Sequence, residues 1–263
     1  MNKFQKRFED PFLYAQYELE LTEKYMIPRF KKAKIDLKGK KLLDIGCGWG
    51  GSTVAFQKRG CICEGFDLSN HQLNIAKKFD KNNNINFFID DICNPKKVKG
   101  KFDIILLRDV MEYVKQPLKV LINAKALLKD NGILYITFPP WYSPYGGNQH
   151  HPKSITKFMP YVHLLPKTIF FSLLRTKKGL MFKDQDFLEE IKRIRDCKIS
   201  ISKFESLVKK SRLKIKEKKL FISRPAFKIR MGLPIINSGI LGKIPLLNEL
   251  ITTGAEYFLK NDS

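Results

Sequence analysis

Short apolar runs alternate with longer helical segments over the first half of the chain, and this alternation constrains the fold more than any other feature. Five runs have the length and composition of strands, at residues 41–45, 61–66, 85–89, 102–107 and 133–138. Helical patterns cover residues 50–59, 70–79 and 116–129. Ser69 is a predicted N-cap for the second of these helices, because its hydroxyl can accept a backbone amide. Strands joined through helices of this length form a parallel sheet with right-handed crossovers.

The same alternation returns near the end of the chain. A helix is predicted at residues 202–211, and strands are predicted at 214–222 and 253–259. Apolar positions at four-residue spacing predict one helix over residues 4–34 before the first strand. The fold class is therefore doubly wound α/β, with a mostly parallel seven-stranded sheet, an N-terminal helix, and insertions after the fifth and sixth strands.

The first predicted strand runs directly into a glycine-rich loop, Asp44-Ile45-Gly46-Cys47-Gly48-Trp49-Gly50-Gly51. A loop without Cβ atoms lets the backbone approach a ligand closely, and the following helix start offers free amide groups. Glycines at 46, 48 and 51 also fit the dinucleotide fingerprint, with Asp67 near the expected ribose position. The loop therefore predicts a nucleoside-bearing cofactor without deciding which one.

Acidic residues at three successive strand ends favour a positively charged cofactor. Asp44 precedes the first glycine, Asp67 ends the second strand, and Asp91 follows the third. A pyrophosphate near Asp44 would meet a like charge in a cleft with little water. S-adenosylmethionine (SAM) has no phosphate and carries a sulfonium and an ammonium group. Turn chemistry is the alternative explanation, because Asp is common after strands.

Four segments resemble the class I SAM-dependent methyltransferases, in particular the methyltransferase type 11 group. They are LLDIGCGWG (42–50), GFDLS (65–69), IDDI (89–92) and FDIILLRDVMEYV (102–114), and the resemblance covers about residues 40–138. It implies a Rossmann-like methyltransferase fold and SAM as cofactor. With the loop residues above, the expected cofactor contacts are Asp44, Gly46, Gly48, Gly50, Asp67, Leu68, Asp91, Ile92 and Arg108.

We interpret residues 1–263 as a single SAM-dependent methyltransferase domain. Residues 1–39 form a helical extension, and residues 40–138 form the SAM-binding core. Residues 139–200 break the strand and helix rhythm and are interpreted as an insertion on the acceptor side of the sheet. Residues 201–263 complete the sheet.

Ligands bind beyond the carboxyl ends of strands in open α/β sheets, so the segments after the fourth and fifth strands should form the acceptor site. The stretch after the fifth strand is dense in aromatic and polar residues, a composition that suits a pocket. Its sequence FPPWYSPYGG (138–147) is similar to that of methyltransferases whose genes lie beside sugar and cell-envelope genes. The expected acceptor-binding residues are Asp109, Trp141, Tyr142, Tyr145 and Gln149.

An oxygen acceptor of high pKa needs a general base. The candidates are His150, His151 and His163, since imidazole titrates near neutral pH, and Glu112 is a fourth. Adjacent histidines rarely point to one centre, and no acidic cluster accompanies them, so no metal site is predicted. The apolar segment 161–174 is predicted to pack as a lid over the acceptor, with an interfacial membrane helix as the alternative.

The net charge of +23 comes from 49 basic and 26 acidic residues. Residues 161–230 hold 20 of those basic residues and 7 of the acidic ones. A lysine-rich solvated surface explains this excess most simply, and peripheral contact with anionic lipid is a further reading. Lysine outnumbers arginine, which argues against a nucleic-acid partner. Five cysteines without paired spacing favour a reducing compartment, so the predicted location is the cytoplasm.

The predicted activity is methyl transfer from SAM. The first prediction for the acceptor is an oxygen of a small molecule or of a glycan related to the cell envelope. A lipid or quinone acceptor, or RNA, is the alternative. RNA base methyltransferases often carry an Asn- or Asp-Pro-Pro-Tyr motif after the fourth strand, where this chain has Leu107-Arg108-Asp109-Val110. An NAD-binding oxidoreductase is the third interpretation, because the glycine loop fits both cofactors.

Overall fold

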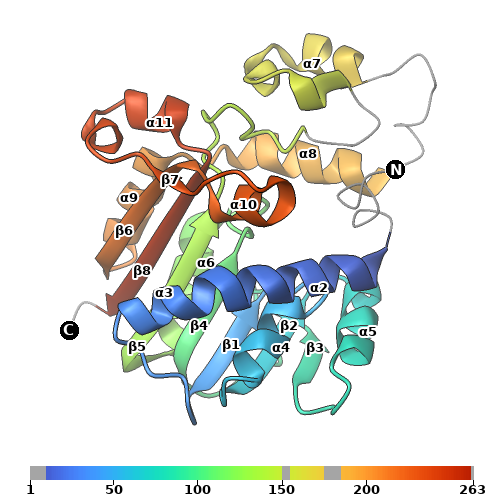
Figure 1. Cartoon of the computed structure of the whole chain (residues 1–263), viewed down its shortest axis with the longest axis vertical. Coiled ribbons are helices and arrows are strands. Elements are labelled where there is room, and N and C mark those ends of the chain that lie inside the picture. The colour runs from blue at the N-terminus through green and yellow to red at the C-terminus, as the bar shows by residue number, and fades with distance from the viewer. Residues whose placement is uncertain (1–9, 150–154, 175–184, 262–263) are drawn as a thin grey trace.

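The computed structural model describes residues 10–149, 155–174 and 185–261. Within them, eight strands form one sheet in the order β3-β2-β1-β4-β5-β8-β6-β7 (Figure 1). The five strands of the first half pair in parallel: β1 (Lys41–Ile45), β2 (Ile62–Asp67), β3 (Asn86–Ile89), β4 (Phe102–Arg108) and β5 (Leu128–Phe138). The doubly wound α/β prediction is confirmed.

The second half of the sheet is antiparallel. Strand β8 (Gly254–Asn261) lies between β5 and β6 (Leu213–Ser223) and runs against both. The prediction of seven strands is one too few, because β7 (Ile236–Asn237) adds a two-residue pairing to the outer edge of β6. Two residues are too short to produce a recognisable alternation of apolar and polar positions.

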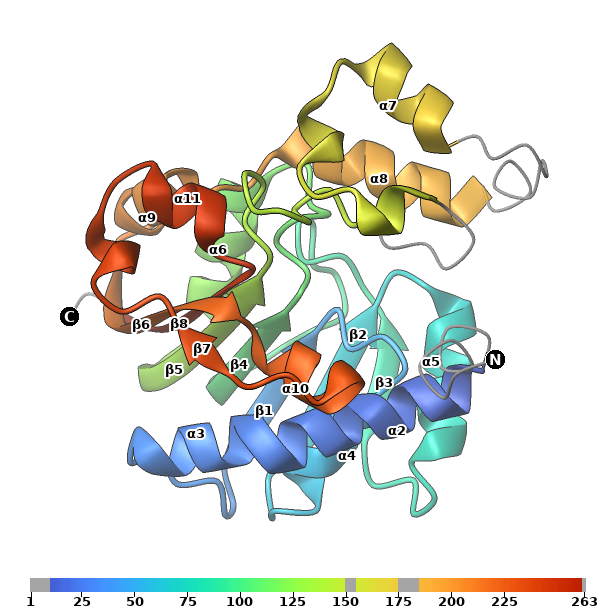
Figure 2. The ribbon, with the colours of Figure 1, turned by 45° about the horizontal axis from the view of Figure 1, so that its top comes forward.

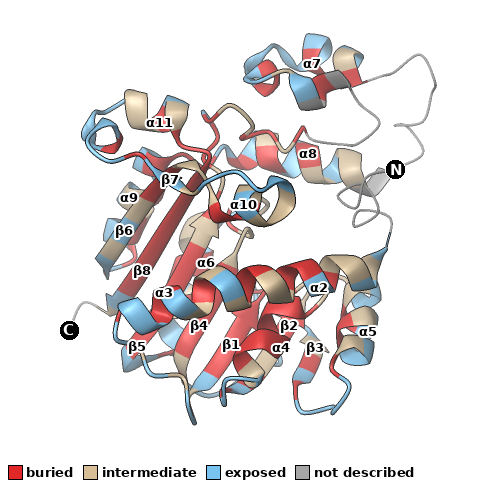
Figure 3. Cartoon of the chain, in the orientation of Figure 1, coloured by how far each residue is buried: buried red, intermediate tan, exposed pale blue. Residues whose placement is uncertain are grey.

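Two helical layers cover the sheet. One face packs against α4 (Gly51–Gln57), α5 (Asn70–Phe79) and the N-terminal helices, and the other packs against α6 (Pro117–Leu127) and α9 (Ile201–Lys210). Neighbouring strand residues serve opposite layers: Leu42 and Ile104 belong to the first core, Leu43 and Ile105 to the second. Figure 3 shows the central strands buried along most of their length. Ser69 caps α5 as predicted, accepting from the amide of Gln72.

The N-terminal segment is helical but not one regular helix. It consists of α2 (Pro11–Leu21), a π-helical turn η1 (Thr22–Met26) and α3 (Ile27–Lys32). The Asp10 side chain caps α2 by accepting from the amides of Phe12 and Leu13. Within the turn, the Thr22 hydroxyl donates to the Glu18 carbonyl and lies 2.9 Å from the Ser52 hydroxyl on α4. The three pieces run across one face of the sheet (Figure 1).

Residues after β5 build a second layer of helices beyond the carboxyl edge of the sheet. Its described elements are η2 (Ile155–Phe158), η3 (Val162–Leu164), α7 (Lys167–Leu174) and α8 (Gln185–Cys197). In Figures 1 and 2, α8 lies between α7 and the sheet. Phe170 and Leu174 of α7 are buried in one cluster with Ile191 of α8. Helix α7 therefore packs on the outer side of α8.

Residues between β6 and β8 form α10 (Pro225–Met231), the edge strand β7, the turn η5 (Leu241–Lys243) and α11 (Leu247–Ile251). Among the described residues, no helix is long and apolar enough to cross a membrane. The division of the chain into an extension, a core and an acceptor-side insertion stays a prediction.

Candidate functional site

The glycine loop joins β1 to α4, and three of its glycines adopt positive φ angles that residues with a Cβ rarely adopt. The φ angles of Gly46, Gly48 and Gly50 are 68°, 55° and 79°. A Cβ on Gly46 would lie 2.5 Å from Val110 Cγ2, so this turn is also closely packed. A Cβ on Gly48 would meet Gln72 Oε1 at 3.9 Å and no other atom nearer than 4 Å. Gly48 therefore leaves open space beside the loop.

The other two glycines serve protein packing. A Cβ on Gly50 would lie 2.8 Å from Ala76 Cβ on α5, so this glycine faces a helix, and its contact with the cofactor stays a prediction. A Cβ on Gly51 would lie 2.7 Å from Glu18 Cβ and would overlap the Ala15 carbonyl on α2. The third glycine of the dinucleotide-like pattern is thus required by the contact between α2 and α4.

A cavity of about 630 Å³ opens beside Gly48 at the carboxyl ends of β1 to β4. This volume lies within the ~300–1,000 Å³ typical of small-molecule sites. Helices α2, α8 and α10 supply its outer walls. Predicted site residues that line it are Gly46, Gly48, Asp67, Leu68, Asp91, Ile92, Arg108, Asp109 and Glu112.

Asp67 holds the glycine loop in place. Its Oδ2 accepts from the Gly48 amide at 3.0 Å, and its Oδ1 accepts from the Ser69 amide at 2.9 Å. Each carboxylate oxygen has a further lone pair that a ribose hydroxyl could use. Leu68 lies at the rim, 63% exposed. The contacts are consistent with the predicted role of this strand end.

Two adjacent acids, Asp90 and Asp91, follow β3 and make different contacts. Burial alone would raise the pKa of Asp90, but backbone amides of residues 91, 96, 97 and 98 donate to its carboxylate and hold the pKa below its usual value. Asp90 therefore organises the turn. Asp91 accepts from the Cys93 amide with Oδ1 and lines the cavity beside Ile92. This placement suits the expected recognition of an adenine amino group.

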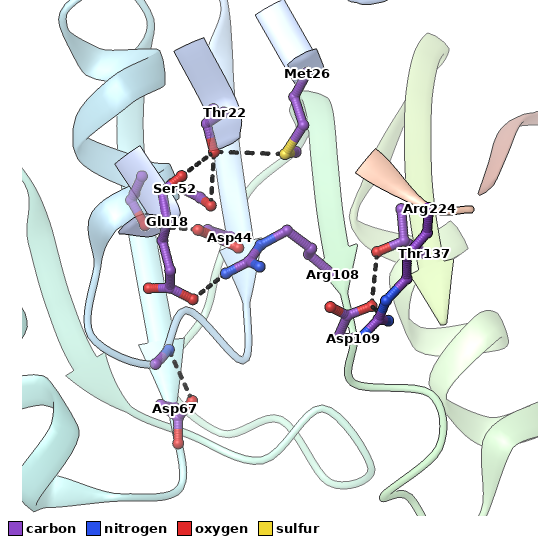
Figure 4. Close-up of polar contacts among 12 residues, drawn as sticks. Glu18, Thr22, Met26, Asp44, Ser52, Asp67, Arg108, Asp109, Thr137 and Arg224 are labelled. Carbon is purple, nitrogen blue, oxygen red and sulfur yellow. Dashed lines mark hydrogen bonds and ion pairs between the residues drawn. The ribbon is translucent and has the colours of Figure 1, made fainter. Parts of the chain in front are cut away.

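Asp44 does not line the cavity, and its direct contact with the cofactor stays a prediction. Its side chain is 3% exposed and lies under the loop, where Oδ2 accepts from the Thr53 hydroxyl of α4 at 2.6 Å (Figure 4). Burial raises the pKa of Asp44 to about 7. The side chain points into the protein because β1 is still extended at this position, and the chain turns only at Gly46.

An ion pair closes the wall of the cavity between β4 and α2. Arg108, at the end of β4, donates to the Glu18 carboxylate, and Figure 4 shows its side chain extending toward α2. Burial raises the pKa of Glu18. Burial alone would lower the pKa of Arg108, but Glu18 and then Asp109 raise it, so the guanidinium stays charged. Sequence analysis missed Glu18, an acid on the face of α2 that also buries Ala15.

Glu112 lines the same end of the cavity and is 3% exposed. Its Oε2 has no hydrogen-bond partner among the described residues. Burial, and then the nearby charge of Asp109, raises the pKa of Glu112 well above its usual value. A raised pKa makes the ionised Glu112 carboxylate a stronger proton acceptor than that of an ordinary glutamate.

A family model described as a methyltransferase domain matches residues 18–176, which is more than half of the chain. The chain belongs to this methyltransferase family. The family uses SAM, which confirms the predicted cofactor. The cavity fits that group, since Gly48 leaves space for it and the carboxylates of Asp67 and Asp91 lie along it.

Curated relatives match less than half of the chain. Ubiquinone biosynthesis O-methyltransferases from Coxiella burnetii (strain RSA 493 / Nine Mile phase I) and Haemophilus ducreyi are 35% and 34% identical over 111 and 110 residues. These matches cover 41% and 38% of this chain and 47% and 45% of the relatives. The chain thus spans about half the length of the curated relatives it matches.

Solved structures resemble the chain over most of its length. A putative sarcosine dimethylglycine methyltransferase from Galdieria sulphuraria has a TM-score of 0.58 at 15% identity, covering 92% of this chain and 86% of its own. A SAM-dependent methyltransferase from Clostridium acetobutylicum has a TM-score of 0.56 at 13% identity, covering 93% and 92%. The plantazolicin methyltransferase BamL, in complex with a triazolic desmethylPZN analog and SAH, has a TM-score of 0.55 at 14% identity, covering 99% and 88%. The class I methyltransferase fold is confirmed.

The surroundings of His163 do not favour its predicted role as general base, which stays a prediction. Its side chain is fully buried, with Nε2 2.6 Å from the Trp141 carbonyl, so that nitrogen must donate. Burial lowers the pKa of His163 to about 4. The ring also packs edge-on against Trp141 and does not line the cavity. His150 and His151 lie outside the described residues.

The aromatic segment after β5 packs largely on itself. Of the predicted acceptor contacts there, Trp141, Tyr142, Tyr145 and Gln149 do not line the cavity. Gln149 is fully buried and donates to the Pro144 carbonyl. The neighbouring Pro139 and Asn148 do line it. A segment that closes on its own backbone in this way contributes few side chains to a ligand site.

The remaining wall of the cavity is formed by helices that the sequence did not single out. Tyr14 comes from α2, Phe187, Glu190 and Arg193 come from α8, and Arg224 and Arg230 come from the start and body of α10. Residues 161–174, the predicted lid, do not line the cavity, and α8 lies beside it instead. A signal existed in the sequence as the basic excess of residues 161–230, but it did not distinguish exposed lysines from cavity arginines.

Proposed function

We propose that this chain is an O-methyltransferase that transfers the methyl group of SAM to a hydroxyl of a small-molecule acceptor. The observation that carries the proposal is the buried carboxyl group of Glu112 at the end of the cavity beyond the glycine loop. The curated relatives support an oxygen acceptor, since they are named ubiquinone biosynthesis O-methyltransferases.

The cofactor would lie along the carboxyl edge of the sheet. In this proposal Asp91 and Ile92 bind the adenine and Asp67 binds the ribose, while Arg108 stands at the methionine end. SAM supplies a methyl group on a sulfonium centre, and methyl transfer needs an acceptor held in line with that bond. Helices α2 and α8 form walls of this region, and a reduced access of water strengthens electrostatic interactions in such a site.

Glu112 is the proposed general base. Burial and Asp109 make its carboxylate more basic than that of an ordinary glutamate, so it can accept the proton of an acceptor hydroxyl as the oxygen attacks. Glu112→Gln keeps the size of the side chain and removes this ability. We expect turnover to fall by about 100-fold or more, within the range typical of general-base catalysis. Binding of S-adenosylhomocysteine should stay within about threefold, since Glu112 is proposed to serve the acceptor rather than the cofactor.

Two experiments test the function. Thermal shifts with SAM, S-adenosylhomocysteine and NAD test the cofactor, and stabilisation by NAD alone would contradict the proposal. Labelled SAM is then offered with hydroxylated aromatic compounds, saccharides, lipid extracts and RNA. Label in hydroxylated compounds that is lost with Glu112→Gln supports the proposal. Label confined to saccharides would favour the glycan acceptor, and label confined to RNA would refute a small-molecule acceptor.

A peripheral lipid contact is a second part of the proposal. Ile240 and Leu246 are each 79% exposed, and the Tyr161 hydroxyl joins this region to the 161–174 segment by donating to the Leu250 carbonyl. Exposed apolar side chains on a protein of net charge +23 favour an anionic membrane surface. Cosedimentation with vesicles containing phosphatidylglycerol should be weakened by Leu246→Glu. Equal cosedimentation with uncharged phosphatidylcholine vesicles would argue against it.

A further inference from the structure

Arg224 lies at the proposed acceptor end of the cavity, and part of its guanidinium has no hydrogen-bond partner among the described residues. It is the N-cap of α10 and follows directly after β6. Its side chain crosses β8 at Gly254, where a Cβ would lie only 2.9 Å from Arg224 Cβ. A glycine at this strand position therefore lets the arginine lie flat against the sheet and reach the cavity.

The hydrogen bonds of Arg224 are incomplete. Its Nε is buried and has no hydrogen-bond partner among the described residues. One terminal nitrogen lies 4.0 Å from Asp109 Oδ1, which is beyond hydrogen-bond distance (Figure 4). Asp109 Oδ1 also accepts from the Thr137 hydroxyl at 3.2 Å. The Arg224 side chain is only 16% exposed, so solvent replaces few of the missing bonds.

Two other buried arginines show the contrast. Arg29 donates from Nε to Glu256 and from a terminal nitrogen to Glu217, each at 2.6 Å. Arg108 is bonded to Glu18. A buried guanidinium without such a partner costs free energy, because its lost hydration is not replaced. Arg224 lines the cavity, so an anionic ligand there can bind its terminal nitrogens, whereas the buried Nε is out of a ligand's reach.

The cavity wall also holds a second arginine on this helix, together with the acids Asp109, Glu112 and Glu190. Arg230 of the same helix also lines the cavity, and its guanidinium lies 4.8 Å from the Tyr17 ring centre. Glu112 lines the same end, and the charge of Arg224 acts on it. An acceptor held between these groups would place its anionic end at Arg224 and its hydroxyl at Glu112.

We propose that Arg224 binds a carboxylate of the methyl acceptor, so that the acceptors are small hydroxy compounds that also carry a carboxylate. The inference rests on the proposed function, because it concerns the acceptor half of the same cavity. The two terminal nitrogens of a guanidinium form two parallel hydrogen bonds with the two oxygens of a carboxylate. A neutral amide of the same shape accepts through one oxygen and presents a donor to the second nitrogen.

The test uses a matched pair of probes, 3,4-dihydroxybenzoate and 3,4-dihydroxybenzamide. Each is titrated calorimetrically into protein saturated with S-adenosylhomocysteine. We expect the acid to bind wild type about 10- to 100-fold more tightly than the amide, as for a hydrogen-bonded buried charge. Arg224→Gln should reduce this ratio to about one. Arg224→Lys should retain a small part of it, because an ammonium keeps the charge without the paired donors.

Lys228→Gln is the matched control. It removes one positive charge from the exposed side of the same helix, and the acid preference should remain. Equal binding of acid and amide by wild type, no saturable binding of the acid, or a preference that survives Arg224→Gln would each overturn the inference. Loss of S-adenosylhomocysteine binding in Arg224→Gln would also overturn it, since Arg224 would then serve the cofactor.

The proposed function fails by a different result. If wild type does not bind SAM or S-adenosylhomocysteine, the cofactor assignment is refuted. If it binds them and shows no preference for the acid, the methyltransferase proposal stands and the carboxylate inference is refuted.

Discussion

Asp44 makes the free energy of unfolding depend on pH, and a single substitution at this position can isolate its contribution. Its carboxyl group lies under the glycine loop, 3% exposed, with the Thr53 hydroxyl as donor. Burial raises the pKa of Asp44 to about 7 in the folded protein, whereas the unfolded chain has a pKa of about 3.9. Asp44→Asn keeps the shape and can accept the Thr53 hydrogen bond, but it does not titrate.

The sign of the effect follows from proton binding. Between these two pKa values the folded protein holds a proton that the unfolded chain has released, so the free energy of unfolding decreases as pH rises. Each pH unit in this window costs about 1.4 kcal/mol. Between pH 5 and pH 7 the wild type should therefore lose about 2–3 kcal/mol through Asp44. The loss ends above the folded pKa, where both states are ionised.

The assay is urea unfolding at pH 5, 6, 7 and 8, followed by tryptophan fluorescence. Because other groups titrate equally in both proteins, the difference between Asp44→Asn and wild type isolates this carboxyl group. That difference should grow by about 2–3 kcal/mol in favour of the variant from pH 5 to pH 8. Asp130→Asn, which removes an exposed carboxylate at the start of β5, is the control and should show no such growth. A difference that stays constant with pH would refute the reasoning, since Asp44 would then be ionised in the folded protein at pH 5.

Three further outcomes are expected. Gly46→Ala should lower the free energy of unfolding by about 2–4 kcal/mol, because of its positive φ and the close contact with Val110. In denaturant titrations, adding Val110→Ala should restore the part of this loss that comes from the close contact, and no restoration would contradict the contact. Arg29→Met should lower the free energy of unfolding by about 3–5 kcal/mol because it strands buried Glu256, whereas Lys24→Met at an exposed pair should cost less than about 1 kcal/mol. Asp67→Ala should weaken S-adenosylhomocysteine binding by about 10- to 100-fold in calorimetry, and an unchanged affinity would exclude Asp67 from the cofactor site.

The sequence predicted the parallel half of the fold well for physical reasons. Strand β1 was placed at its observed bounds, and β4 and α5 were within one residue of theirs. Each of these elements has a continuous apolar face and a clear glycine, proline or capping residue at an end. The π-helical turn within the N-terminal segment was missed, because its sequence has the same spacing as an ordinary helix.

The cofactor half of the site was easier to predict than the acceptor half. Asp67 and Asp91 follow strands whose carboxyl ends meet at one edge, so their positions follow from the topology. Spacing did not show that Asp44 and Gly50 face the protein, because the direction of a side chain beside a positive φ depends on the turn itself. Arg224 is more than a hundred residues from the glycine loop, and only the packing of α10 brings it to the cavity.

The ion pair between Arg29 and Glu256 has a consequence for the order in which the site is assembled. The two residues are 227 positions apart, and the N-terminal helices that carry Arg29 also carry Glu18, which forms a wall of the cavity. During synthesis, Arg29 on the N-terminal helices can therefore form its ion pair with Glu256 only after β8 has been made. The glycine loop can form early from local contacts, but a closed cavity requires contacts between distant parts of the sequence, which form slowly. Binding of SAM should thus report that the last strand is in place, rather than that the glycine loop has folded.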